Sequence, residues 1–88
     1  MKAIVTVIGK DKEGIIAKVS GKLSELDVNI EDISQTIMQG YFAMMMMVEV
    51  KKESEIAVIS QRLDELGKQV DVNIRIQHED IFNAMHRI

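Results

Sequence analysis

The sequence predicts an α+β fold in which a four-stranded antiparallel sheet carries two helices on one face. Three observations lead to this prediction. Apolar residues recur at helical spacing in two segments, β-branched or alternating apolar residues dominate four others, and the two halves of the 88-residue chain resemble each other. The chain is long enough for one small domain with little core to spare, and it contains neither cysteine nor proline.

The first half of the chain is expected to fold as strand, helix, strand. Residues 2–8 are mostly β-branched, which is typical of a strand buried on most of both faces. In the helix that follows, Asp11 is a candidate N-cap and Glu13 suits the positive end of the helix dipole. Its apolar stripe consists of Ile16, Val19, Leu23 and Leu26. Residues 29–38 form the second expected strand.

The second half repeats this order. Residues 41–50 form a third strand that pairs with the second across Gln39-Gly40, where the glycine permits the positive φ of a tight hairpin. The second helix has Ser54 as a candidate cap, and Gly67 stands where a helix commonly ends. Its apolar stripe consists of Ile56, Ile59, Leu63 and Leu66. In the last strand, residues 70–77 alternate strictly between apolar and polar.

The two halves look like a duplicated βαβ unit. The apolar stripe of the first helix recurs forty positions later, and the tetrapeptide D-V-N-I occurs at 27–30 and again at 71–74. Two such units with right-handed crossovers interleave into a ferredoxin-like βαββαβ arrangement with both helices on one face of the sheet.

Apolar side chains are expected on both faces of this sheet. In the third strand, one face carries Phe42, Met44, Met46, Val48 and Val50, and the other carries Ala43, Met45 and Met47. A monomer rarely exposes so large an apolar patch. The pattern therefore predicts a homodimer or a higher homo-oligomer.

Residues 78–88 extend beyond the last strand and can form a short helix. Such a helix would place Ile81, Phe82, Met85 and Ile88 on one face. Three outcomes stay open for it: packing across its own sheet, packing on a partner, or fraying.

Composition argues against two classes of partner. The net charge is −3 and the eleven Lys and Arg residues are scattered, which does not suit a nucleic acid interface. No apolar segment approaches the length of about 20 residues needed to span a bilayer, and no secretory leader is recognisable. We expect a cytoplasmic protein with no nucleic acid or membrane partner.

No arrangement of side chains indicates catalysis, a metal or a cofactor. Neighbours among the four consecutive methionines point to opposite faces, which favours packing over a soft-metal site. His78 and His86 lack a tight ligand spacing. Glu31 and Asp32 are adjacent on a strand and should face opposite ways, so they cannot act as an acid and base pair.

The loop after the first strand contains Gly9 and Gly14, which match the first half of the phosphate-binding pattern G-x-x-x-x-G-K-[ST]. Ile15 and Ile16 stand where that pattern needs the lysine and the hydroxyl, so the match fails. What remains is a turn that delivers free backbone N–H groups at a helix start, which suits a carboxylate or a phosphate. The alternative that Gly14 only eases a turn stays open.

The segments GKDKEGIIAKVSGKL and DVNIEDISQTI resemble the ACT domain, a ligand-sensing module. The chain is similar to small stand-alone ACT proteins and to the ACT modules of a glycine-cleavage regulator. The resemblance covers residues 1–77, leaves 78–88 as a C-terminal extension, and depends on Asp11, Gly14 and Ile15 in the loop and on the pair Asn29 and Ile30.

The resemblance implies a site for a small molecule, most often an amino acid, at a boundary between two domains. Amides near Gly14 and Ile15 would face a ligand carboxylate, Asp11 would receive an ammonium group or cap the helix, and Asn29 would contribute its side chain from the same or a neighbouring copy. Ile30 would support the strand from beneath. One departure is that relatives often carry Arg-Pro where this chain has Lys12 and Glu13, which leaves the identity of the ligand open.

The function expected from this resemblance is that of a non-enzymatic regulatory module, which binds an amino acid as a homo-oligomer and either acts on another protein or sequesters its ligand. The alternative is a structural protein–protein interaction module whose ligand pocket is vestigial.

Overall fold

The computed structural model describes residues 1–10 and 13–85, and of Met38 it describes the backbone alone. Four strands, three helices and one short 3-10 turn make up the described chain. In order they are β1 (Lys2–Lys10), α1 (Ile15–Glu25), β2 (Asn29–Met38), β3 (Tyr41–Glu49), the turn η1 (Glu53–Glu55), α2 (Ile56–Val70), β4 (Val72–His78) and α3 (Glu79–Met85).

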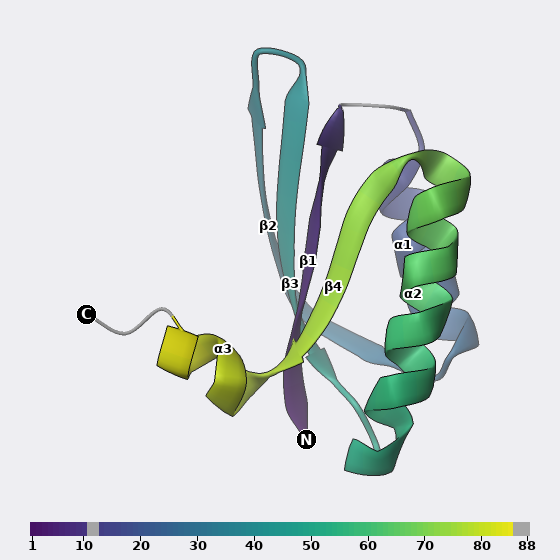
Figure 1. Ribbon diagram of the computed structural model, residues 1–88, viewed down its shortest axis with the longest axis vertical. Coiled ribbons are helices and arrows are strands. Elements are labelled where there is room, and N and C mark those ends of the chain that lie inside the picture. Colours follow the sequence, from purple (N-terminus) through teal and green to yellow (C-terminus); the bar gives the residue numbers. More distant parts are fainter. Residues whose placement is uncertain (11–12, 86–88) are drawn as a thin grey trace.

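The four strands form one antiparallel sheet in the order β2-β3-β1-β4. Strands β1 and β3 are central, and β2 and β4 are the two edges. Figure 1 shows α1 and α2 side by side on one face of the sheet. The predicted ferredoxin-like fold with both helices on one face is confirmed.

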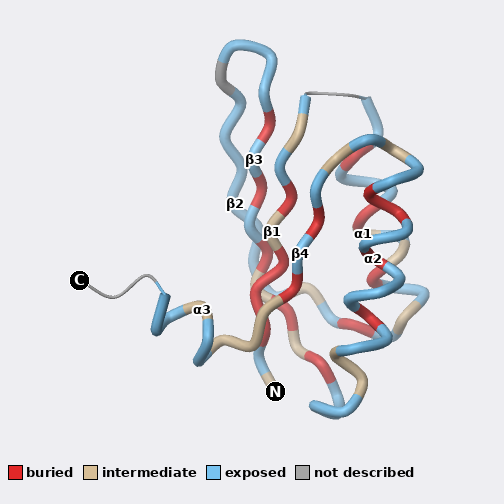
Figure 2. Tube along the Cα trace, viewed as in Figure 1, coloured by how far each residue is buried: buried red, intermediate tan, exposed pale blue. Residues whose placement is uncertain are grey.

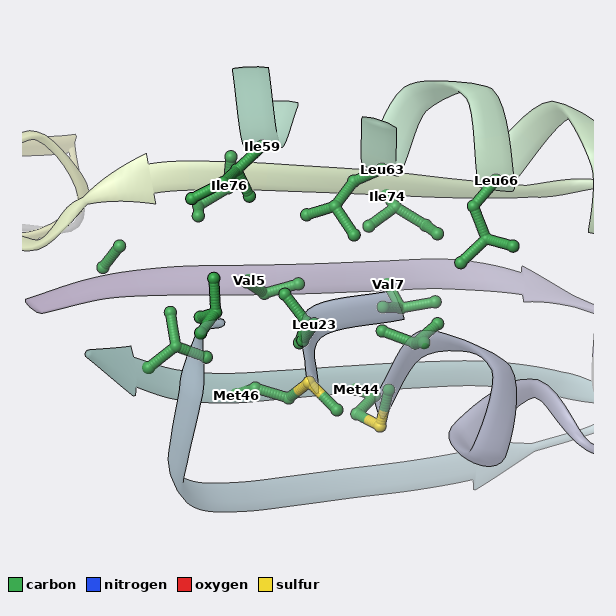
Figure 3. Packing of buried hydrophobic residues seen from close by; sticks show 14 of the residues in the cluster. Val5, Val7, Leu23, Met44, Met46, Ile59, Leu63, Leu66, Ile74 and Ile76 are labelled. Carbon is green, nitrogen blue, oxygen red and sulfur yellow. The ribbon is translucent and has the colours of Figure 1, made fainter. Parts of the chain in front are cut away.

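The core lies between the sheet and these two helices (Figure 3). Leu23 of α1 and Leu63 of α2 are fully buried against it, as are Met44 and Met46 of β3. Met45, between those two methionines, is 41% exposed on the other face. The alternation expected along β3 is therefore confirmed.

The hairpin between β2 and β3 is as tight as the sequence predicted. Met38 pairs with Tyr41, so Gln39 and Gly40 alone form the loop. Both residues have positive φ, 50° at Gln39 and 83° at Gly40, as the type I′ turn of a two-residue hairpin requires.

The starts of both helices differ from the sequence prediction. The N-cap of α1 is Gly14, which has a left-handed φ of 80°, so the prediction of Asp11 as the cap is wrong. The N-cap of α2 is Glu55, and Ser54 lies inside the preceding turn η1. Neither cap residue makes a side-chain hydrogen bond, so helix formation depends here on buried apolar side chains. In α1 these include Ile15, whereas Ile16, predicted for the apolar stripe, is 38% exposed.

The end of α2 also differs, because Gly67 lies inside the helix. α2 continues to Val70 and ends at Asp71, which has a left-handed φ of 61°. A Cβ atom on Gly67 would lie 2.6 Å from the backbone carbonyl oxygen of Val72. Glycine is needed at this position for close packing of the helix on β4, and not for the helix end.

The repeated D-V-N-I tetrapeptide marks where each helix turns into a strand. Asp27 has a φ of 62°, nearly equal to that of Asp71. After α1, the amide of Val28 donates to the carbonyl of Leu23 and that of Asp27 to the carbonyl of Ser24, at 2.9 and 3.0 Å. These two bonds form a Schellman motif with aspartate in the position usually held by glycine.

The sheet face opposite α1 and α2 is called the open face below. Its residues are those of β1 that point away from the helices, together with the residues of β3 and β4 that pair with them. It carries Lys2, Ile4, Thr6, Ile8 and Lys10 of β1, Tyr41, Ala43, Met45, Met47 and Glu49 of β3, and Asn73, Arg75 and Gln77 of β4. In Figure 1, α3 stands on this side at the lower end of the sheet.

Candidate functional site

The loop between β1 and α1 brings its backbone to the surface at Gly14. This glycine is exposed, and a Cβ atom placed on it would meet nothing within 4 Å. The first hydrogen bond of α1 runs from the Lys18 amide to the Gly14 carbonyl at 2.9 Å. The amides that precede Lys18 in the first turn have no partner within the helix, so they can meet a ligand anion. Asp11, predicted for the same site, lies outside the described residues.

Ile15 contributes differently from a typical pocket-lining residue. Its side chain is only 3% exposed and belongs to the core between sheet and helices. The side chain is thus not available to a ligand, which leaves the backbone N–H group of Ile15 for the role that the resemblance implies. The buried side chain fixes the position of that amide.

Asn29 and Ile30 lie where β2 begins. Asn29 is exposed and pairs with Glu49 of β3, whereas Ile30 is partly buried against the core and pairs with Val48. The side chain of Asn29 is therefore free to approach a ligand, and that of Ile30 supports the strand.

The structure does not bring these two groups of residues together within one chain. Gly14 and Ile15 lie at the start of α1, and Asn29 follows the turn after its end. A helix of 11 residues is about 16 Å long at a rise of 1.5 Å per residue. Figure 1 shows the same separation, with the end of β1 and the start of α1 at one end of the sheet and the entry to β2 at the other.

A hollow of about 410 Å³ lies beside Asn29, between α1 and the start of β2. Its lining residues are Ser20, Ser24, Asp27, Val28, Asn29, Ile30, Glu49 and Lys51. The Asp27 carboxylate accepts a hydrogen bond from the Lys51 ammonium group. This bond, together with Coulombic attraction, raises the pKa of Lys51 above its ordinary value. Both side chains are largely exposed, so the ion pair adds little to the stability of the fold. It places one negative and one positive charge in the lining of the hollow.

Sequence reasoning did not identify the serines and the lysine of this hollow. Ser20 and Ser24 are four residues apart on α1, between members of its apolar stripe, and Lys51 is the second residue after β3. The spacing of the two serines indicates a common face of the helix. Their position beside Asn29 depends on how α1 packs on the sheet, which the helical period alone does not determine.

A β-bulge interrupts β2 directly after Ile30. The pairing with β3 moves from Ile30 opposite Val48 to Asp32 opposite Met47, which leaves Glu31 out of the ladder. The expectation of strict alternation for Glu31 and Asp32 is wrong, because a bulge inserts one extra residue. Glu31 instead reaches across to Lys2 of β1, with 3.5 Å between Oε1 and Nζ.

Two further features are absent from the part of the chain that the structure describes. No group of three His, Asp or Glu side chains there could hold a metal ion. None of the described helices is long and apolar enough to cross a membrane.

The family model of the ACT domain matches residues 2–77. The chain belongs to the ACT domain family. A UPF0237 protein of Clostridium acetobutylicum is 54% identical over 89 residues, which cover all of both chains. The match to the family model begins at β1 and ends within β4, and α3 lies beyond it.

Solved structures share this architecture. An ACT domain protein from Streptococcus pneumoniae superposes with a TM-score of 0.84 at 46% identity, and 98% of each chain is covered. The regulatory subunit of aspartate kinase from Thermus thermophilus, in its ligand-free form, superposes with a TM-score of 0.70 at 22% identity. That match covers 89% of this chain and 51% of the other, and it shows the shared fold alone.

Proposed function

We propose that this ACT domain is a non-enzymatic, cytoplasmic regulatory module that binds an amino acid between two copies of itself. ACT domains are typically small-molecule-binding regulatory modules. The observation that carries the proposal is the separation of the exposed groups expected to bind ligand. The loop at Gly14 and the start of β2 at Asn29 lie at opposite ends of α1, so one pocket can contain both only if they come from different copies.

Strand β2 is a suitable edge for this contact. Its residues 31–37 are all exposed, and Figure 2 shows the strand pale blue along this stretch. Ile33 and Ile37 pair with the buried residues Met46 and Phe42, so they lie on the helix side, yet they are 42% and 58% exposed. Such an edge, with unpaired backbone groups and apolar side chains, favours pairing with another strand.

A two-fold axis between two antiparallel β2 strands would complete the site. The axis places the start of one β2 beside the end of the other. The end of β2 lies at the same end of the sheet as Gly14, because Met38 pairs with Tyr41 and Tyr41 pairs with Lys10. Asn29 of the second copy would then approach the free amides after Gly14 of the first.

Regulation would follow if the ligand stabilises one arrangement of the two copies. A ligand shifts an equilibrium only by its difference in affinity for the two states. A site shared between copies provides this difference, because separating or rotating the copies takes the site apart. The regulated protein would then bind the surface of the ligand-stabilised pair and thereby respond to the amino acid.

The proposal predicts that one or a few of the twenty amino acids raise the melting temperature. A ligand at 100 times its dissociation constant should stabilise the folded state by about 2.7 kcal/mol. Thermal shift with each amino acid in turn checks this. If none of them changes the melting temperature, the module has no amino acid site, and the structural role with a vestigial pocket gains support.

Replacing Gly14 with leucine is expected to abolish the shift, because the side chain would occupy the space in front of the helix amides. Gly40→Leu is the matched control, since Gly40 has a φ of 83° and no neighbour within 4 Å of its Cβ position, much like Gly14. Both variants carry a similar backbone strain of about 1–2 kcal/mol. Calorimetric titration should find binding in the Gly40 variant alone; full affinity in the Gly14 variant would remove this loop from the site.

The double variant Ile33→Lys and Ile37→Lys is expected to separate the copies and to lose binding, although it leaves Gly14 and Asn29 unchanged. Two buried charges at the β2 contact should cost more than the apolar contact provides. Sedimentation velocity checks the mass. Val58→Lys, on the outer surface of α2 at 53% exposure, is the control and should keep both mass and binding. An unchanged mass in the double variant would rule out the β2 edge as the contact.

A further inference from the structure

Burial changes steadily along the open face from one end to the other. Ile4 of β1 is 7% exposed at the end where α3 begins, whereas Ile8 of the same strand is 54% exposed. On β3, Met45 is 41% and Tyr41 is 60% exposed. Helix α3 therefore covers one end and leaves an apolar area at the other, which we call the far patch and which consists of Ile8, Tyr41, Ala43 and Met45.

Helix α3 also has apolar side chains that its own chain does not cover. Ile81 is 56% and Met85 is 62% exposed. The helix stands away from the sheet on the side opposite α1 and α2 (Figure 1), and its contacts are with β1 and β4. A helix of seven residues depends on tertiary packing for its stability. Both α3 and the far patch thus have apolar surface to bury.

The helix cannot cover the far patch of its own chain. Met85 approaches Gln77, with 3.5 Å between the sulfur and Nε2, and Gln77 pairs with Ile4 at the covered end of the sheet. Ile8 lies four residues further along β1, about 13 Å away at 3.3 Å per residue. A second chain is needed to bring α3 to the far patch.

Charges at the two surfaces are complementary. Helix α3 begins with Glu79 and Asp80. Lys10 and Arg75 flank the far patch, and neither makes an ion pair within the described part of the chain. Opposite charges around an apolar centre favour contact between α3 and the far patch over contact between two far patches.

We propose that two copies pack with their open faces together, so that α3 of each copy covers the far patch of the other. A two-fold axis that runs across the strands, between the facing sheets, reverses the strand direction of the second copy. The end that carries α3 in each copy then faces the far patch of the other copy. One two-fold axis therefore gives two equivalent contacts, each of which buries an α3 helix against a far patch. The β2 edge takes no part in this contact, so the two contacts together would give a tetramer.

Cross-linking between single-cysteine variants tests the proposal, because the natural chain contains no cysteine. Ile8→Cys and Met85→Cys copies are mixed and treated with a short bis-maleimide. We expect the mixed dimer to form about tenfold faster than in a control mixture of Val58→Cys and Met85→Cys. Val58 is 53% exposed, close to Ile8 at 54%, but it lies on α2 behind the sheet. Equal rates in the two mixtures would overturn the proposal.

Charge reversal gives a second readout that does not depend on the cross-linker. Arg75→Glu alone and Asp80→Arg alone should each weaken association several-fold at low salt, and the double variant should recover most of the loss. Arg62→Glu on α2 is the matched control and should have no effect. A double variant that associates no better than either single variant would contradict the pairing. Undiminished association of both single variants, with amino acid binding retained, would refute this second surface and leave the shared ligand site intact.

Discussion

Replacing Met46 with alanine is expected to lower the free energy of unfolding by about 2–5 kcal/mol. Met46 is fully buried between the sheet and the helices, where truncation removes apolar contacts and leaves a cavity (Figure 3). Its neighbour Met45 has the same chemistry but is 41% exposed on the open face. Met45→Ala should therefore change the unfolding free energy by less than about 1 kcal/mol in the separated chain.

Urea unfolding of the two variants under identical conditions gives this comparison. It should be made at several protein concentrations, because association would add stability that depends on concentration. Equal losses for Met45 and Met46 at the lowest concentration would mean that strand β3 does not alternate as described.

Replacing Gly67 with alanine is expected to destabilise the protein by about 1–3 kcal/mol, although alanine is the better helix former by about 1 kcal/mol. The new Cβ atom would lie 2.6 Å from the carbonyl oxygen of Val72, which is backbone and cannot rotate away. Helix α2 would have to move from β4, with which it shares much of the core. Thermal or urea unfolding measures the loss.

Gly21→Ala is the matched control for this prediction. Gly21 lies in α1, is exposed, and has nothing within 4 Å of a Cβ position. Alanine there should raise the unfolding free energy by up to about 1 kcal/mol through helix propensity alone. A gain at Gly67, or a loss at Gly21 in the separated chain, would contradict the packing described here.

The arrangement of strands and helices could be predicted from the sequence because local periods and the internal duplication agreed. The alternation of residues 41–50 fixed which methionines entered the core, and the repeat of D-V-N-I marked both helix-to-strand turns. The helix termini could not be predicted as well. Gly67 resembled a C-terminal glycine, but its role depends on a contact with Val72, which follows from tertiary packing and leaves no local signal.

The residues expected to bind ligand could be named only through the family resemblance, and their spatial relation required the structure. Gly14 and Asn29 are 15 positions apart, a spacing compatible with one pocket if the intervening segment were a loop. A helix between them holds them at opposite ends. The lining by Ser20, Ser24 and Lys51 likewise depends on how α1 packs beside the start of β2.

The sequence indicated apolar residues on both faces of the sheet. It did not indicate that only one end of the open face would be covered. Residues 78–88 allowed three outcomes, and the structure shows α3 at one end of that face. Ile4 is covered there and Ile8 is not, so the open face of β1 has a buried end and an exposed end. That division comes from the length of α3, which is too short to cross the sheet.

Subunit complementation measures most directly whether two copies share one ligand site. Gly14→Leu chains and Asn29→Ala chains are each expected to lose binding of the amino acid that gives the largest thermal shift. After exchange of subunits in an equal mixture, half of the dimers should be mixed, and each should contain one intact site. Calorimetric titration should then find about a quarter of the natural number of sites per chain. A mixture that binds no more than its two components would contradict a site formed by Gly14 of one copy and Asn29 of the other.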